Sequence, residues 1–199
     1  MRLAQLRAAP LADLAEHAGD VARACHAMAV RFHRGGRLVV FGNGECGTDA
    51  QHVSVEFVHP VIVGKRALPA CSLTADVATL TGIATRAGFN EVFAHQIRVL
   101  AEPADIAMGI SSDGRDPSVL RGLECAHDLG LLTVALVGAG ESGDGAPIAT
   151  SPAVDHPLVA RSADPRLVKE VQVTTYHVLW ELVHVFFEQP GVLDPRVVT

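Results

Sequence analysis

The chain alternates short apolar runs with amphipathic segments, and this alternation limits its fold more than any other feature. Apolar runs of strand length lie at 37–44, 67–74, 105–112, 131–138 and 153–160, and the segments between them have the 3.6-residue period of helices. Strands that alternate with helices form a mostly parallel sheet covered by helices on both faces. We therefore predict an α/β protein, a three-layer α-β-α sandwich around a central five-stranded sheet.

A single domain accounts for all 199 residues. We expect a long amphipathic helix at about 11–33, a core of strands and helices at 37–160, and a closing helix at about 165–188. Pro69 favours an edge position or an early kink for the strand at 67–74, because proline cannot donate a hydrogen bond to a neighbouring strand. We find no internal repeat and no linker.

The composition predicts a folded, soluble protein, with 49% hydrophobic residues, 19% charged residues and a net charge of −6. Neither nucleic acid nor an anionic membrane is expected as a partner of such a chain. Its four cysteines form no C-x-x-C pair, which argues against a disulfide framework or a structural zinc site. The first twenty residues lack the apolar core of a secretory signal, and we predict a cytoplasmic location.

The loops that follow the first and third strands are the expected ligand sites, because parallel sheets bind ligands at the carboxyl ends of their strands. In the loop at 111–117, a serine pair and a glycine at a helix start would suit a phosphate. Two aspartates there would repel a phosphate dianion, although one of them is also suited to capping the next helix. These serines and aspartates are Ser111, Ser112, Asp113 and Asp116.

The loop at 42–49 contains Gly-x-Gly-x-x-Gly between a strand and a helix, which formally matches the dinucleotide-binding fingerprint. That fingerprint also needs an acidic residue about twenty positions later, to bind the ribose. The window at 65–68 reads Lys-Arg-Ala-Leu, and Asp76 comes too late. We therefore rank nucleotide binding below the binding of a sugar phosphate, and a plain tight turn also fits the glycines.

Two helices carry candidate catalytic side chains. His52 and Glu56 are four residues apart and share a helix face. An imidazole and a carboxylate so placed suit Zn²⁺ binding or acid/base catalysis, and an ordinary surface pair has the same spacing. On the closing helix, His177 lies mid-helix, where a lone histidine is commonly a hydrogen-bonded core residue. We assign Glu181 and His184 to the surface or to a subunit contact.

Taken together, these motifs resemble those of the phosphoheptose isomerases, the sedoheptulose 7-phosphate isomerase branch of the sugar-isomerase (SIS) domain family, which has a flavodoxin-like fold. The resemblance covers nearly the whole chain, in the segments GNG…DAQH…E, LTAD…AGFNEVF, DIAMGISS.G, VLRGLE.A..LGL.TVALVG and KEV…HVLWELVH. It implies ketose–aldose isomerisation of a sugar or sugar phosphate through an enediol. It also implies a homotetramer with active sites at subunit interfaces.

By the same resemblance, Glu56 and His177 correspond to the acid/base pair of the family. His52, Glu56 and His177 also correspond to three residues that bind zinc in some members, whereas Lys169 replaces the glutamine that is their fourth ligand. A protonated ammonium cannot bind a metal ion. One hypothesis is that Lys169 replaces the charge of the metal as a fixed cation beside an enediolate; the alternative is that Zn²⁺ is the cofactor.

The phosphate-binding residues of the family are only partly present. Cys46 replaces a serine in the first loop, and two serines of the second loop are aspartates, so hydroxyl donors are lost and negative charge is gained. Each lost charged hydrogen bond is worth ~1.5–3 kcal/mol. A sugar without phosphate or with a cationic group is an alternative substrate, and a non-catalytic protein like the replication-initiator-associating branch is an alternative function. The predicted substrate-binding residues are Asn43, Gly44, Cys46, Asp76, Ser111, Ser112, Asp113, Asp116 and Lys169.

Overall fold

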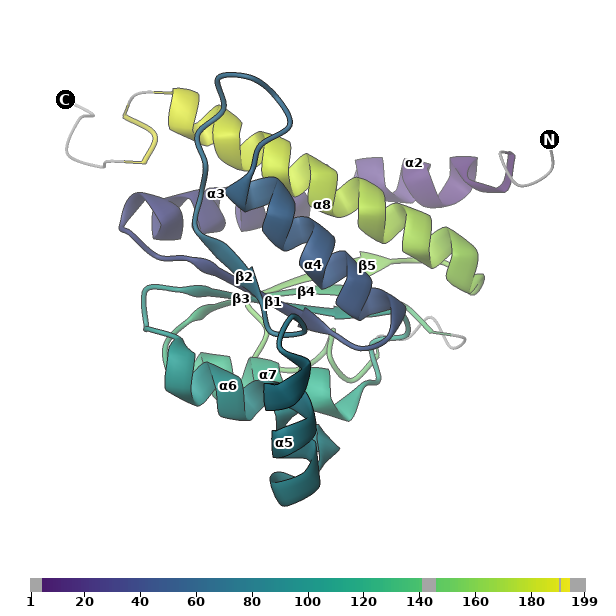
Figure 1. Cartoon of the computed structure of the whole chain (residues 1–199). Helices are drawn as coiled ribbons and strands as arrows, with labels where there is room; N and C mark the ends of the chain where they lie inside the picture. The colour runs from purple at the N-terminus through teal and green to yellow at the C-terminus, as the bar shows by residue number, and fades with distance from the viewer. Residues whose placement is uncertain (1–4, 141–145, 190, 194–199) are drawn as a thin grey trace.

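The computed structural model describes residues 5–140, 146–189 and 191–193. Its centre is a five-stranded parallel sheet in the order β2-β1-β3-β4-β5, with helices on both faces (Figure 1). The predicted three-layer α/β fold is therefore confirmed. The strands are β1 (Leu38–Gly42), β2 (Ala70–Ser72), β3 (Ile106–Ser111), β4 (Leu132–Gly138) and β5 (His156–Ala160).

The helices form two layers. α3, α4 and α8 cover one face of the sheet, and α6 and α7 cover the other, with α5 beyond them in Figure 1. A short 3₁₀ turn, η1, joins α5 to α6. Their bounds are α2 (Ala8–Glu16), α3 (Ala18–His33), α4 (Glu45–Val58), α5 (Val77–Ala87), η1 (Phe89–Glu91), α6 (Val92–Leu100), α7 (Pro117–Asp128) and α8 (Pro165–Glu188).

The three central strands are apolar along their whole length because both of their faces are covered. Every residue of β1, β3 and β4 is buried. Successive side chains of a strand point to opposite faces, and in β1 Val40 packs under α3, α4 and α8, whereas Val39 and Phe41 pack on the side of α6 and α7. Continuous apolar runs are typical of such doubly covered parallel strands.

The N-terminal helix is not continuous, which corrects the predicted single helix at about 11–33. It breaks at His17, which has φ −98° and ψ 17°, between α2 and α3. α2 packs against α8, whereas α3 packs against both α8 and the sheet. A straight helix could not follow both surfaces, and Gly19 lowers the helix propensity beside the break.

β2 is an edge strand, as Pro69 indicated, but only Ala70–Ser72 pair with β1, so the predicted strand at 67–74 is too long. The carbonyl of Pro69 still accepts a hydrogen bond from the amide of Leu38 (2.9 Å). α8 has the predicted bounds. Asp164, directly before Pro165, is its N-cap, and the side chain of Asp164 accepts a hydrogen bond from the amide of Arg166. Within the described ranges, no helix is both long and apolar enough to cross a membrane.

Candidate active site

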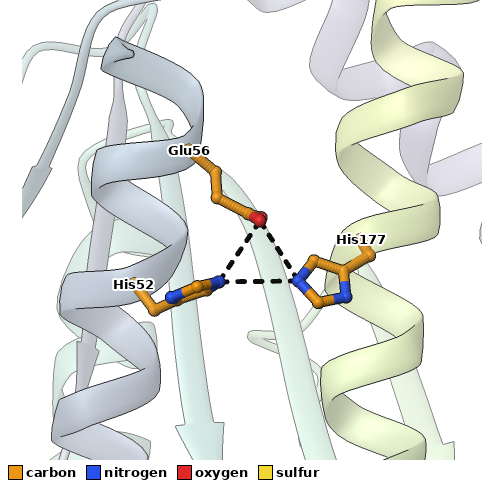
Figure 2. Close-up of side chains that lie close together, drawn as sticks. All are labelled: His52, Glu56 and His177. Carbon is orange, nitrogen blue, oxygen red and sulfur yellow. Dashed lines mark hydrogen bonds and ion pairs between the residues drawn. The ribbon is translucent and has the colours of Figure 1, made fainter. Parts of the chain in front are cut away.

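α4 and α8 bring His52, Glu56 and His177 together at the protein surface (Figure 2). Oε1 of Glu56 lies 3.2 Å from Nε2 of His52 and 3.1 Å from Nε2 of His177, and the two Nε2 atoms are 3.5 Å apart. The Glu56 side chain is 15% exposed, whereas the two histidines are each about half exposed. The predicted acid/base and metal-binding residues therefore form one cluster, which is accessible to a ligand.

Side chains of α8 hold the two helices in register beside this cluster. Nε1 of Trp180 donates to the carbonyl of Glu56 (3.0 Å). One turn later, Nε2 of His184 lies 2.9 Å from the carbonyl oxygen of Arg66, and His184 is only 2% exposed. The surface position expected for His184 is therefore wrong, because the side chain is buried between α8 and the segment after α4, where its two ring nitrogens lie close to the carbonyl oxygens of Trp180 and Arg66.

Tyr176 lies behind the two histidines and was not predicted as a site residue. Its ring centroid is 4.8 Å from that of His177 and 5.7 Å from that of His52, and the residue is 3% exposed. Burial raises the pKa of Tyr176 well above its usual value, and the negative charges of Asp49 and Glu56 raise it further. The phenol therefore stays protonated and can donate a hydrogen bond near the cluster.

Lys169 binds α4 and does not stand alone as a cation. Its Nζ donates to the carbonyl of Glu45 (3.1 Å) and forms an ion pair with the carboxylate of Asp49. The Asp49 side chain is 7% exposed and that of Lys169 is 30% exposed. The main partner of this ammonium is thus a buried carboxylate. Asp49 was missed by sequence reasoning, although its position three residues before His52 places it on the same helix face.

The two glycine- and serine-containing loops meet at the carboxyl ends of β1 and β3, as predicted. They line an open cavity of about 420 Å³, which we call the strand-end cavity. Gly42 permits the close approach of the loops, because a Cβ at this position would lie 2.7 Å from the carbonyl oxygen of Ile110. Six predicted substrate-binding residues line the cavity: Asn43, Cys46, Ser111, Ser112, Asp113 and Asp116.

The other predicted residues lie elsewhere. Gly44, with φ +54°, lines a neighbouring cavity of about 370 Å³ between α4 and α5, which we call the α5 cavity. Asp76 caps α5 and accepts hydrogen bonds from the amide (3.1 Å) and the hydroxyl (2.6 Å) of Thr79. These bonds lower the pKa of Asp76, and they explain the acidic residue at this position without a ligand.

Asp116 occupies the anion-binding position at the start of α7. Its Oδ1 accepts from the amides of Ser118 (2.9 Å) and Val119 (3.3 Å), and its Oδ2 accepts from Nδ2 of Asn43 (2.5 Å). The predicted N-cap is therefore present. These amides would otherwise be available to a phosphate, so the chain supplies its own anion at this helix end.

Replacing Asp116 by alanine should destabilise the protein by about 1–2 kcal/mol, because α7 loses its N-cap. Asparagine caps helices as well as aspartate does, but its amide nitrogen cannot accept from Nδ2 of Asn43, so Asp116→Asn should lose less stability than Asp116→Ala and still unfold at a slightly lower urea concentration than the wild type. Asp128→Ala, at the exposed far end of α7, is the control. Urea unfolding followed by circular dichroism measures all three. An Asp116→Ala variant as stable as the wild type would contradict the capping role.

Ser111 and Asp113 form hydrogen bonds within the loop at 111–117. The hydroxyl of Ser111 accepts from the amide of Gly114 (3.0 Å) and lies 3.3 Å from Oδ1 of Asp113, which also accepts from the amide of Arg115 (2.9 Å). Gly114 has φ +68°, and a Cβ there would lie 2.3 Å from the Cβ of Ala146. This loop conformation thus depends on a glycine, a hydroxyl and a carboxylate.

Cys46 is a buried thiol at the floor of the strand-end cavity, 3% exposed. Burial, with a smaller contribution from the charge of Asp49, raises the pKa of Cys46 to about 11. At pH 7, a pKa of about 11 leaves roughly one thiol in ten thousand as the reactive thiolate. The side chain therefore packs as a small apolar group and is no nucleophile.

Iodoacetamide should accordingly leave Cys46 unmodified at pH 7, and its labelling should rise about tenfold per pH unit toward pH 10. Peptide mass spectrometry of the folded enzyme follows this labelling site by site. Cys71, which is only partly buried, is the internal comparison. Labelling of Cys46 at pH 7 as fast as that of a free thiol would contradict the assigned environment.

In one chain, the cluster and the strand-end cavity lie far apart. Cys46 and Glu56 are ten residues apart on α4, which corresponds to about 15 Å along the helix axis. A sugar phosphate held in the strand-end cavity would therefore have its carbonyl well away from the carboxylate of Glu56. The predicted site residues therefore form two separate groups within one chain, the cluster on α4 and α8 and the residues of the strand-end cavity.

Comparisons with known proteins identify the family of the chain. A family model of the SIS domain matches residues 5–138. The phosphoheptose isomerase of Solidesulfovibrio magneticus is 40% identical over 181 residues, which cover 90% of this chain and 85% of the relative. That of Aquifex aeolicus is 36% identical over 156 residues, or 78% of either chain.

Solved structures give the same result. The phosphoheptose isomerase from Francisella tularensis superposes with a TM-score of 0.79 at 28% identity, covering 92% of this chain and 94% of that one. The phosphoheptose isomerase from Neisseria gonorrhoeae gives 0.77 at 25% identity, covering 92% and 96%. The chain therefore belongs to the SIS-domain family, within its phosphoheptose isomerase branch.

Proposed function

We propose that the protein isomerises a ketose phosphate of the sedoheptulose 7-phosphate type to the corresponding aldose phosphate through an enediol. The observation that carries this proposal is the carboxylate of Glu56 held between the imidazoles of His52 and His177. The relatives named phosphoheptose isomerase support the substrate class. The non-catalytic alternative is not favoured, since the side chains needed for proton transfer are together.

Two side chains of the cluster, Glu56 and His177, suit the proton transfers of this reaction. A carboxylate accepts a proton and has none to offer when ionised, so Glu56 would remove the proton from the carbon next to the carbonyl. An imidazole can both accept and donate. His177 would therefore move the proton between the two oxygens of the enediol, and Glu56 would return its proton to the neighbouring carbon.

The cluster also fits a divalent metal ion. A tetrahedral Zn²⁺ site with bonds of 2.0–2.1 Å has ligand atoms about 3.3 Å apart, and the three atoms of the cluster are 3.1, 3.2 and 3.5 Å apart. His52, Glu56 and His177 would hold the ion, and it would supply Lewis-acid stabilisation of the developing negative charge on oxygen. Lys169 pairs with Asp49 and would not be a ligand of the ion.

We further propose that the enzyme is a cytoplasmic homotetramer whose subunits complete one another's sites. The separation of about 15 Å between Cys46 and Glu56 along α4 supports this, because a second subunit could bring its own cluster to the strand-end cavity. An exposed apolar surface lies at the C-terminal end of α4, next to Glu56 in the sequence. Val55 and Val58 line a groove of about 550 Å³ beside β2, and Val61 and Val63 after α4 are 79% and 101% exposed.

The substrate is tested by supplying the purified protein with sedoheptulose 7-phosphate, with unphosphorylated sedoheptulose, and with each after addition of Zn²⁺. Mass spectrometry of the derivatised products distinguishes ketose from aldose. We expect an aldose phosphate from the first sugar only. Turnover of the unphosphorylated sugar alone would show that Asp113 and Asp116 have changed the substrate, and no aldose from either would contradict the proposed function.

A further inference from the structure

The turn η1 forms a wall of both cavities, although sequence reasoning assigned it no role. Phe89 and Asn90 line the strand-end cavity, and Phe89 also lines the α5 cavity. Both residues are exposed, and Phe89 is 57% exposed. An amide can donate to and accept from sugar hydroxyls, and an aromatic ring can pack against sugar C–H groups. The chemistry of this wall therefore suits a sugar.

None of the three residues of the turn is buried. The turn begins after Gly88, whose φ of +90° side chains rarely adopt, and the amide of Glu91 donates to the carbonyl of Gly88 (3.2 Å). Val92, directly after the turn, is fully buried, so the chain is anchored in the core again only from there. Segments with few buried contacts open readily, and another interaction must fix the turn.

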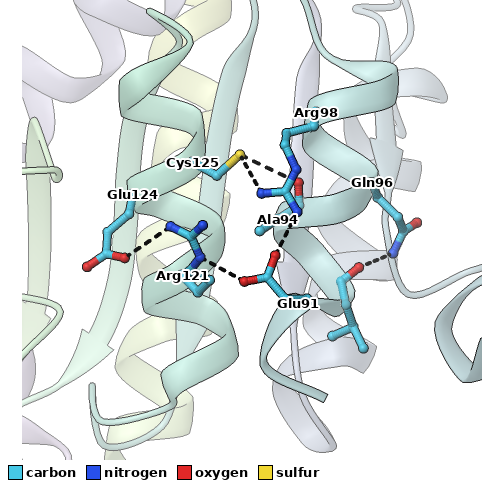
Figure 3. Close-up of polar contacts among 8 residues, drawn as sticks. Glu91, Ala94, Gln96, Arg98, Arg121, Glu124 and Cys125 are labelled. Carbon is cyan, nitrogen blue, oxygen red and sulfur yellow. Dashed lines mark hydrogen bonds and ion pairs between the residues drawn. The ribbon is translucent and has the colours of Figure 1, made fainter. Parts of the chain in front are cut away.

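Glu91 provides that interaction (Figure 3). Its Oε2 accepts from Nη2 of Arg98 on α6 (2.6 Å), and its Oε1 accepts from Nε of Arg121 on α7 (2.9 Å). The hydrogen bonds from these two guanidinium groups lower the pKa of Glu91, which keeps the carboxylate ionised at neutral pH. One side chain thus ties the turn to two helices.

The second of these helices also lines the strand-end cavity with its first residue. α7 begins at Pro117, which lines the strand-end cavity beside Asp116. Through Arg121, Glu91 therefore fixes the spacing between the turn and the loop that carries Asp113 and Asp116. A change in this spacing would alter the shape of the cavity and would leave the cluster on α4 and α8 untouched.

We propose that the turn Phe89–Glu91 is a specificity element of the sugar site, in which Asn90 contacts the bound sugar and Glu91 positions the turn through Arg98 and Arg121. This proposal rests on the proposed isomerase function. It makes Asn90 a binding residue and Glu91 a positioning residue. Neither takes part in proton transfer.

The experiment compares the wild type with Glu91→Gln, Asn90→Ala and Glu124→Gln. Glu124 is the matched control, because its carboxylate also approaches Arg121 (3.7 Å) but belongs to α7 and not to the turn. With sedoheptulose 7-phosphate, Glu91→Gln and Asn90→Ala should each raise KM about fivefold and leave kcat within about twofold, the pattern of lost binding that does not depend on the transition state. Glu124→Gln should change neither constant.

Hydrogen exchange of the free protein provides a readout that needs no activity. Glu91→Gln should speed amide exchange at 88–91 severalfold, whereas Asn90→Ala and Glu124→Gln should not. An unchanged KM in Glu91→Gln and Asn90→Ala, or a fall in kcat instead, would overturn the specificity role. Unchanged exchange in Glu91→Gln would overturn the positioning role. If the wild type converts no sugar, the proposed function fails, and exchange alone then decides whether Glu91 positions the turn.

Discussion

Glu56→Gln is expected to lower kcat by about 10³-fold, because the amide cannot accept the proton that the carboxylate removes from the substrate carbon. The substitution keeps the size of the side chain, so the fold should be retained. KM should change little, since the strand-end cavity that holds the far end of the sugar is lined by other residues. Steady-state kinetics with sedoheptulose 7-phosphate measures both constants.

Glu170→Gln is the control for this experiment. Glu170 is a glutamate of α8, the helix that carries His177, but its carboxylate pairs with Arg7 and is not part of the cluster. It should have wild-type kinetics. Circular dichroism should show the same secondary structure and melting temperature for both variants and the wild type. A Glu56→Gln enzyme with more than a tenth of the wild-type kcat would contradict the assigned role of the carboxylate.

Lys169→Met is expected to lower the free energy of unfolding by about 3 kcal/mol, because it leaves the carboxylate of Asp49 buried without its partner. Asp49→Asn should cost only about 1 kcal/mol, since the ammonium is 30% exposed and can turn toward water. The double variant should be more stable than Lys169→Met alone. Urea unfolding followed by the fluorescence of Trp180, the single tryptophan, measures these differences at a fixed protein concentration.

The same variants distinguish two roles for Lys169. If the ammonium served mainly as a cation beside the enediolate, Lys169→Met would lower kcat strongly and leave the unfolding curve in place. If the ammonium serves mainly as the partner of Asp49, Lys169→Met should shift the unfolding curve to lower urea concentration. A Lys169→Met protein as stable as the wild type would therefore contradict a structural role for this pair.

Much of the fold could be predicted because the signals are local. The apolar runs gave the five strands, and the closing helix predicted at about 165–188 matches α8. The break at His17 could not be predicted, because the apolar period continues through it and the change of direction follows from packing on α8 and the sheet. The predicted length of β2 was wrong because pairing with β1, not apolar character, decides where a strand ends.

The candidate site was only partly predictable for a related reason. His52 and Glu56 are linked by helix spacing, but the approach of His177 depends on how α4 and α8 pack, and the resemblance to a family supplied it. Buried polar residues were the main omission. Asp49 and His184 interrupt apolar stripes, a pattern that surface residues also produce, and only the structure shows the partners that make their burial possible.

Asp116 shows that a residue can be placed in a site from the sequence while its hydrogen-bond partners stay unknown. Asp116 was expected to oppose an anion, and it does lie in the strand-end cavity. Its carboxylate is already bound by the amides of Ser118 and Val119 and by Asn43. Its charge is therefore partly compensated by the helix end, and the cavity opposes a phosphate less than the sequence suggests.

The most direct test of the central claim, proton removal by Glu56, is isomerisation of sedoheptulose 7-phosphate in deuterated water. A proton held on a carboxylate can exchange with solvent before it returns to carbon. Mass spectrometry and proton NMR of the aldose phosphate should therefore find deuterium on the carbon next to the carbonyl, with the wild type and not with Glu56→Gln. Aldose phosphate formed by Glu56→Gln as fast as by the wild type, with deuterium at that carbon, would contradict proton removal by Glu56.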